Sequence, residues 1–372
     1  MKPTTIFIFI LLLTACQKPK DEVKTIHIIE GKNLKLSEFI EEVSFISLPE
    51  EVNGYSFDKF LESENYFILG DIQSSLNTYI LSKNFELVSI INNYGEGPGQ
   101  YLTVLNLAFN EESQLVEILT IKNVLRYSID GEFINSAEVP ITWINNLVHD
   151  SGDDYILYPQ NQSHAINSAT DFLVKWNLEK KTVTPIIQHR VNEGVISFKD
   201  VNNLTKHRDT IYASHVFLDT IYTLTKGELG KIFLKFPKEN LPLELLTYEV
   251  IESQNSLLDS DKYSHHYPLI KISDQFLLSN YVTNNAINFF ILNKSTNNVI
   301  AGSTFIDDIN LGMNYIQPKH IDNEGYFYTI HQFEYIWAQA KNSQTDSQIS
   351  KYLNQLETEP NFVVVKYKLK NF

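Results

Sequence analysis

The chain has 372 residues, 43% of them hydrophobic and 12% aromatic, which excludes intrinsic disorder because such a chain can bury enough apolar surface to fold. Its single cysteine excludes a disulfide framework and a cysteine-rich zinc site. The 45 acidic residues outnumber the 30 basic residues, and the resulting formal net charge of -15 repels phosphate backbones, so no nucleic-acid partner is expected.

The N-terminal segment has the features of a lipoprotein signal peptide. Lys2 supplies a short positive region, and the apolar run at residues 6–13 is too short to span a bilayer. It ends in Leu13-Thr14-Ala15-Cys16, which resembles the bacterial lipobox, where cleavage precedes a cysteine that receives a diacylglycerol. We predict that residues 1–15 are removed and that lipidated Cys16 anchors the chain in the outer membrane. A plain signal peptide or a buried strand is the alternative.

A polar tether is predicted to follow the anchor, over residues 16–42. Residues 17–24 (QKPKDEVK) are polar and contain Pro19, as in extended linkers. Lys20-Asp21-Glu22 resembles the lysine-plus-acidic signal that sends Bacteroidetes lipoproteins to the cell surface. We therefore expect exposure on the cell surface, with the periplasmic leaflet as the alternative.

Residues 43–372 consist of short β-rich runs separated by Gly, Asn, Asp and Ser. A hairpin pattern of apolar strand, polar turn and apolar strand recurs along the chain, with turn markers at Asn84, Asp130, Lys180, Lys226, Lys294 and Lys368. The first three intervals between these markers are blade-sized, about 40–50 residues, and the last two are longer. The pattern predicts an all-β fold, a six-bladed β-propeller, with a pair of unrelated β-sandwiches as the alternative.

The two long intervals contain apolar residues at helical spacing, in residues 241–258 and 333–357. We expect two short helical insertions on one face, where they would cap a mouth of the central channel. The alternative is that they only cover exposed strand edges. The ring must also close, and residues 25–29 or 43–48 would supply the missing strand.

The loop Gly95-Glu96-Gly97-Pro98-Gly99-Gln100-Tyr101 is the sharpest motif. With the lipobox, it resembles the six-bladed β-propeller lipoproteins of Bacteroidetes. Further similarities are DTIYTL (219–224), DNEGYFY (322–328) and FVVVKYKLKN (362–371). The resemblance implies the fold and supplies no catalytic residues. Three glycines would let the loop form an anion-binding nest, or make it a tight turn between blades.

No recognisable catalytic or cofactor motif occurs in the sequence. HExxH, GxSxG and EF-hand patterns are absent, and the ten histidines are scattered. His265-His266 would bind a metal only if a carboxylate joined them. Loops around the predicted channel mouth carry the low-specificity candidates for ligand binding, which are Glu96, Gln100, Tyr101, His164, Arg190, His215, His265 and His266.

We therefore predict a surface-anchored, non-enzymatic propeller that needs no cofactor. Its partner would be a protein or an extracellular ligand such as a glycan or a peptide. The alternative is a metal-assisted lyase or hydrolase acting at the channel mouth, in which histidines and carboxylates converge on a metal.

Overall fold

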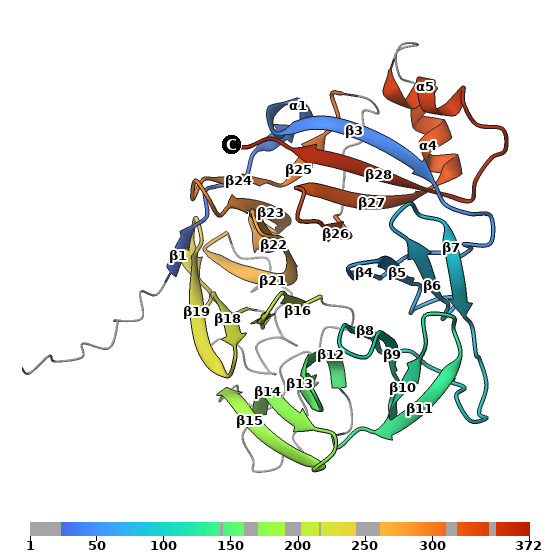
Figure 1. Ribbon diagram of the computed structural model, residues 1–372. Coiled ribbons are helices and arrows are strands. Elements are labelled where there is room, and N and C mark those ends of the chain that lie inside the picture. The colour runs from blue at the N-terminus through green and yellow to red at the C-terminus, as the bar shows by residue number, and fades with distance from the viewer. Residues whose placement is uncertain are drawn as a thin grey trace, which may run out of the picture.

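The computed structural model describes residues 24–141, 144–159, 170–189, 202–215, 217–242, 261–309, 318–341 and 347–372. Over these ranges the chain is almost entirely β, and its sheets surround a central channel as the six blades of a propeller (Figure 1). The predicted six-bladed β-propeller is confirmed.

In the first three blades, four consecutive strands pair antiparallel in chain order, from the channel outward. Blade 1 consists of β4 (Lys59–Glu62), β5 (Tyr66–Gly70), β6 (Thr78–Ser82) and β7 (Leu87–Ile91). Blade 2 consists of β8 (Asn106–Asn110), β9 (Leu115–Leu119), β10 (Asn123–Tyr127) and β11 (Phe133–Glu138). Blade 3 consists of β12 (Ile144–Ser151), β13 (Asp154–Pro159), β14 (Thr170–Asn177) and β15 (Thr182–His189).

The next two blades repeat this order and gain short edge strands. Blade 4 consists of β16 (Leu204–His207), β17 (Thr210–Ser214), β18 (Thr220–Thr225) and β19 (Glu228–Lys235). Blade 5 consists of β21 (Tyr263–Ile272), β22 (Phe276–Thr283), β23 (Ala286–Asn293) and β24 (Val299–Gly302), and β20 (Glu239–Asn240) pairs in parallel with β21.

Blade 6 joins the two ends of the chain. Its inner strands are β26 (His320–Ile321), β27 (Tyr326–Gln332) and β28 (Phe362–Leu369), and its outermost strand is β3 (Ile40–Ser47). β3 pairs antiparallel with β28, with Phe45 opposite Val365. The ring is thus closed by the predicted segment at residues 43–48, and the last blade has no open edge at this position.

The N-terminal strands also pair with the propeller. β1 (Lys24–His27), which overlaps the other predicted closing segment at residues 25–29, pairs in parallel with β19. It extends the outer edge of blade 4 and does not close the ring. β2 (Asn33–Lys35) pairs in parallel with β25 (Thr304–Ile306). The expected tether is therefore too long: its part from residue 24 to 42 is bound to the blades, because alternating apolar residues such as Ile26 and Leu34 are buried against them.

Five of the six predicted turn markers lie at hairpin turns between the third and fourth strands of a blade. Lys226, for example, has a φ of 51° in the turn between β18 and β19. The sixth, Lys368, is wrong, because it lies inside β28 opposite Tyr326. The C-terminal repeat has no fourth strand of its own, since β3 occupies that place.

The helices of the described residues are α1 (Leu36–Phe39), α4 (Phe333–Ala340) and α5 (Gln348–Leu353). α4 and α5 form the predicted insertion between β27 and β28, whereas residues 243–258 of the other insertion lie outside the described residues. Both helices lie at the periphery beside blade 6 and not across the channel (Figure 1). Tyr352 of α5 stacks on Phe45 of β3, with ring centroids 5.4 Å apart. The two described helices therefore cover a strand edge and do not cap a channel mouth.

The hydrophobic core is divided into clusters between neighbouring blades. Between blades 6 and 1, for example, Phe60 and Phe67 pack against Tyr328 and Val364. Similar clusters fill the other interfaces of the ring. The inner strands that line the channel are thereby held from both sides, which makes the channel wall rigid.

Candidate functional site

A cavity of about 720 Å³ occupies the central channel. All six inner strands contribute to its wall, which carries a ring of aliphatic side chains, one from each blade: Leu61, Leu107, Leu147, Leu204, Ile270 and Ile321. Because the strands of each blade are antiparallel, the connections alternate between two faces. The cavity is lined at one end by turns that join first to second strands, such as Ser63–Glu64, Arg208 and Asn323. The predicted ligand-binding loops, such as residues 95–101 between β7 and β8, join neighbouring blades and belong to the opposite face.

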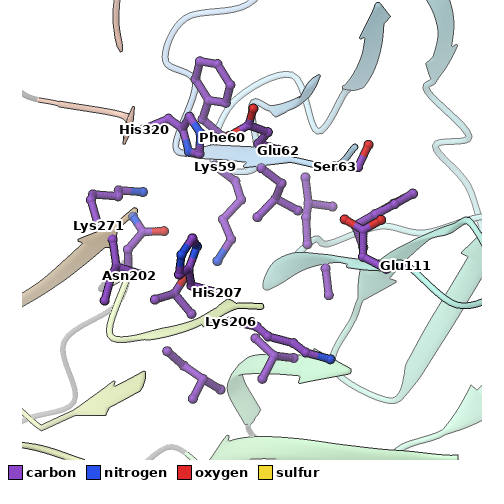
Figure 2. A pocket seen from close by; sticks show the side chains of 18 of the residues that line it. Lys59, Phe60, Glu62, Ser63, Glu111, Asn202, Lys206, His207, Lys271 and His320 are labelled. Atoms are coloured by element: carbon purple, nitrogen blue, oxygen red, sulfur yellow. Dashed lines mark hydrogen bonds and ion pairs between the residues drawn. The ribbon is translucent and has the colours of Figure 1, made fainter. Parts of the chain in front are cut away.

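Two lysines interrupt the aliphatic wall. Lys59 begins β4 in blade 1, and Lys271 lies near the end of β21 in blade 5; the residues are 6% and 9% exposed. Figure 2 shows their side chains extending into the same space, near Asn202 and His207. Among the described residues, neither ammonium group has a hydrogen bond or an ion pair.

Burial changes the acidity of both ammonium groups. It lowers the pKa of Lys59 to about 8, because a charge inside the channel loses hydration. Burial also lowers the pKa of Lys271 to about 7, and repulsion from Lys59 and from Lys319 adds to this effect. Both lysines therefore change charge near neutral pH.

Lys319 precedes the inner strand of blade 6, the blade between blades 1 and 5. Burial lowers its pKa, whereas the negative charge of Asp58 acts in the opposite direction. Burial raises the pKa of Asp58 despite its contacts with Ser56 and with the Gln73 backbone. Lys319 thus has a nearby counter-charge, unlike Lys59 and Lys271.

Two carboxylates near the cavity, Glu62 and Asp274, already have partners. Glu62 accepts hydrogen bonds from Lys83 at 2.5 Å and pairs with the His320 ring at 2.7 Å. Although burial opposes ionisation, these two partners hold the pKa of Glu62 near 2. Asp274 contacts His207 at 2.9 Å and also pairs with Arg208.

Lys206, His149 and Glu111 of the wall also have partners within the chain. The Lys206 ammonium donates to the backbone carbonyls of His149 and Asp150, and the His149 ring contacts the Gly152 carbonyl at 2.8 Å. Burial raises the pKa of Glu111, whose carboxylate lies beside Gln114. Lys59 and Lys271 are therefore the two cations of the described wall that lack a partner.

The predicted loop residues form hydrogen bonds within their own loop and to blade 1. The Gln100 side chain accepts a hydrogen bond from the Gly97 backbone N–H at 2.7 Å, and the Tyr101 hydroxyl donates to the Leu76 and Ile91 carbonyls. Glu96 belongs to the same loop between β7 and β8. These contacts match the tight-turn alternative, and none of the three residues lines the cavity.

Three predicted histidines lie close together between blades 4 and 5. The His266 ring contacts the Ser279 hydroxyl at 2.7 Å, and His265 packs against Phe217. Burial lowers the pKa of His265 to about 4 and that of His266 to about 3, with His215 nearby adding to the effect on His266. Within the described ranges, no group of three or more His, Cys, Asp or Glu residues could hold a metal ion.

Cys16, His164 and Arg190 lie outside the described residues. The ligand-binding role of the eight predicted residues stays a prediction, and the six that are described do not line the cavity. Sequence reasoning missed Lys59 and Lys271. The available signal was a lysine beside apolar strand residues, directly before Phe60–Leu61 and within Leu269–Ile272.

No described helix is long and apolar enough to cross a membrane. The family model described as "Domain of unknown function (DUF4934)" matches residues 23–368. No curated protein matches the chain.

Two solved structures from Bacteroides are similar to this chain. A candidate exported protein of Bacteroides fragilis is 17% identical, with a TM-score of 0.78, over 94% of this chain and 100% of that chain. A member of the DUF4221 family from Bacteroides vulgatus is 12% identical, with a TM-score of 0.51, over 90% of this chain and 98% of that one. At these identities the likeness shows the fold.

Proposed function

We propose that this chain, which belongs to the DUF4934 family, is an exported, non-enzymatic binding module that holds a small ligand in its central channel. The cavity of about 720 Å³ carries this proposal. Its volume is within the range of about 300–1,000 Å³ that is typical of small-molecule sites, and it combines aliphatic walls with a few polar groups. A short peptide or a small glycan has a matching size.

The rigid wall supports binding without a large conformational change. The inner strands are held by the packed clusters between blades, as Leu147 of blade 3 is held against Ala108 of blade 2. A preformed cavity loses little ligand affinity to the cost of ordering the protein. We therefore place the ligand in the channel and not on the outer surface of the ring.

Filling the cavity tests this function. Thr205 of β16 lines the cavity, so Thr205→Trp would occlude it. The control is Ile134→Trp on the outer strand of blade 2, where Ile134 is 49% exposed. Thermal unfolding of the full chain would be followed with free amino acids, dipeptides, monosaccharides, disaccharides and dicarboxylates, after circular dichroism has shown that both variants fold.

We expect at least one compound class to raise the Tm of the parent and the Ile134→Trp chain but not that of the Thr205→Trp chain. If no class raises the Tm of the parent, or if Thr205→Trp binds as the parent does, the channel is not the binding site.

A lipid anchor at Cys16 in the outer membrane, with the propeller on the cell surface, completes the proposal. The lipobox resemblance and the lysine-plus-acidic residues at 20–22 support it. Cys16→Ser would leave the chain without lipid, so we expect its release from the membrane fraction, while the parent incorporates labelled fatty acid. Protease treatment of intact cells should remove the parent propeller; full protection would place it in the periplasmic leaflet instead.

A further inference from the structure

We infer that the channel binds an oxyanion, a carboxylate, sulfate or phosphate group, between the ammonium groups of Lys59 and Lys271. This inference rests on the proposed function, because it assigns a ligand class to the same cavity. The uncharged part of such a ligand would lie along the aliphatic ring of the wall, against residues such as Leu147 and Leu204.

The placement of the two lysines is the first argument. They come from blades 1 and 5, which lie on either side of blade 6, and both side chains enter the same cavity (Figure 2). Each is more than nine-tenths buried and has an apolar neighbour in the sequence, Phe60 after Lys59 and Ile270 before Lys271. Two separate blades thus place unpaired cations in one cavity.

The missing counter-ion is the second argument. A buried charge is unfavourable unless it is paired, and two like charges at one site are more unfavourable still. No described carboxylate forms an ion pair with either lysine: Glu62 is held by Lys83 and His320, and Asp274 by His207 and Arg208. An external oxyanion would supply the pairing that the described wall does not.

Lys319, whose charge is partly offset by Asp58, also acts on Lys271, and Glu111 and Lys206 line other parts of the wall. The exposed Glu64 also reaches the cavity. Because the chain carries a formal net charge of -15, anions are repelled at long range. Binding therefore depends on short-range contact with the two lysines and not on electrostatic attraction of any anion.

The protonation of the lysines gives the site a characteristic pH dependence. In the unliganded channel the pKa is about 7 for Lys271 and about 8 for Lys59. A bound anion favours the protonated forms, so binding near neutral pH takes up protons. Affinity is highest below pH 7 and falls as pH rises, by up to about tenfold per pH unit for each lysine that must be protonated. His207, whose pKa is lowered by burial, gains its charge only below this window.

Calorimetry on the full chain in detergent tests the inference with four probes: inorganic phosphate, sulfate, succinate and its neutral analogue succinamide. The variants are Lys59→Met, Lys271→Met and the double substitution, which keep side-chain length and remove the charge. Lys122→Met, at an exposed turn of blade 2, is the matched control. Removing an unpaired buried charge does not endanger folding.

We expect at least one anion to bind at pH 6.5, while succinamide does not bind. Each single lysine substitution should weaken binding about tenfold or more, the double substitution should abolish it, and Lys122→Met should leave it unchanged. Titrations of the parent chain in buffers of different ionisation heats should show proton uptake at pH 7.5. Preference for succinate or for phosphate would distinguish a carboxylate ligand from a phosphate ligand.

Equal binding of succinate and succinamide, or unchanged binding by the double variant, would overturn the anion site. If neutral amino acids or sugars bind in the channel and no anion does, the proposed function stands and this inference fails. If Thr205→Trp leaves anion binding intact, the anion binds elsewhere and the proposed channel function fails with it.

Discussion

The charge of Lys59 in blade 1 lowers the pKa of Lys271 in blade 5, although blade 6 separates the two strands that carry them. The propeller closes into a ring, so residues on non-adjacent blades face each other across one channel. The first two predictions follow from this pair.

The two lysines should react faster with acetic anhydride at pH 7.5 than the exposed lysines do. Their pKa values of about 7 and about 8 leave a large fraction as neutral amines, whereas an ordinary lysine has a pKa near 10.4. Competitive labelling followed by peptide mass spectrometry measures the rate for each residue. Exposed Lys122 serves as the reference after correction for access. Labelling curves for Lys271 that match an ordinary lysine would contradict the lowered pKa.

Stability should rise with pH through the range above neutrality because of the same lysines. Between pH 7 and pH 10 the unfolded chain keeps protons on Lys59 and Lys271 that the folded chain has lost, so the free energy of unfolding increases with pH. Each lysine contributes up to about 1.4 kcal/mol per pH unit in its window. Urea unfolding at pH 7 and pH 9.5 measures how much the free energy of unfolding changes with pH. This change is compared between the parent and the Lys59→Met/Lys271→Met chain. A parent that gains no more stability than the double variant contradicts this prediction.

Glu117→Ala should destabilise the fold by about 3 kcal/mol. The fully buried Glu117 carboxylate accepts hydrogen bonds from Arg126 at 2.9 Å and from the Tyr155 hydroxyl at 2.5 Å, which links blade 2 to blade 3. Its loss leaves the Arg126 guanidinium without its carboxylate in a largely buried place. Glu117→Met combined with Arg126→Met should cost less than the two single substitutions together, because no unpaired charge remains. Additive costs in urea unfolding would show that the pair is not coupled.

Gly99→Ala in the loop between blades 1 and 2 should be more destabilising than Gly152→Ala. Both glycines have positive φ, 70° and 53°, so both substitutions strain the backbone by about 1 kcal/mol. A Cβ at Gly99 would lie 2.4 Å from a ring atom of Phe133, whereas a Cβ at Gly152 meets nothing within 4 Å. We expect an additional cost of about 1–3 kcal/mol at Gly99. Similar Tm values for the two variants would show that the Phe133 ring moves aside without cost.

The repeat pattern alone identified the propeller, because blade hairpins are local structures whose polar turns recur at blade-sized intervals. Asn84, Asp130 and Lys226 all lie at such turns. The pattern was wrong at Lys368, where β3 from the other end of the chain occupies the position that a local hairpin would fill. Which residues form a strand is thus decided locally, whereas the pairing of β3 with β28 that closes the ring depends on the two distant ends of the chain.

The sequence by itself determined the blades and the second helical insertion, and it named two segments that could close the ring, of which the structure uses residues 43–48. Only the tertiary structure decided which polar residues meet in the channel, because Lys59, Lys271 and Lys319 are far apart in the chain and belong to blades 1, 5 and 6. Burial and mutual repulsion lower the pKa of Lys271, and these effects depend on distances that only ring closure sets. Packing of the blades also buried Tyr101 in the cluster between blades 1 and 2, and ring closure left two unpaired lysines in the cavity at the centre.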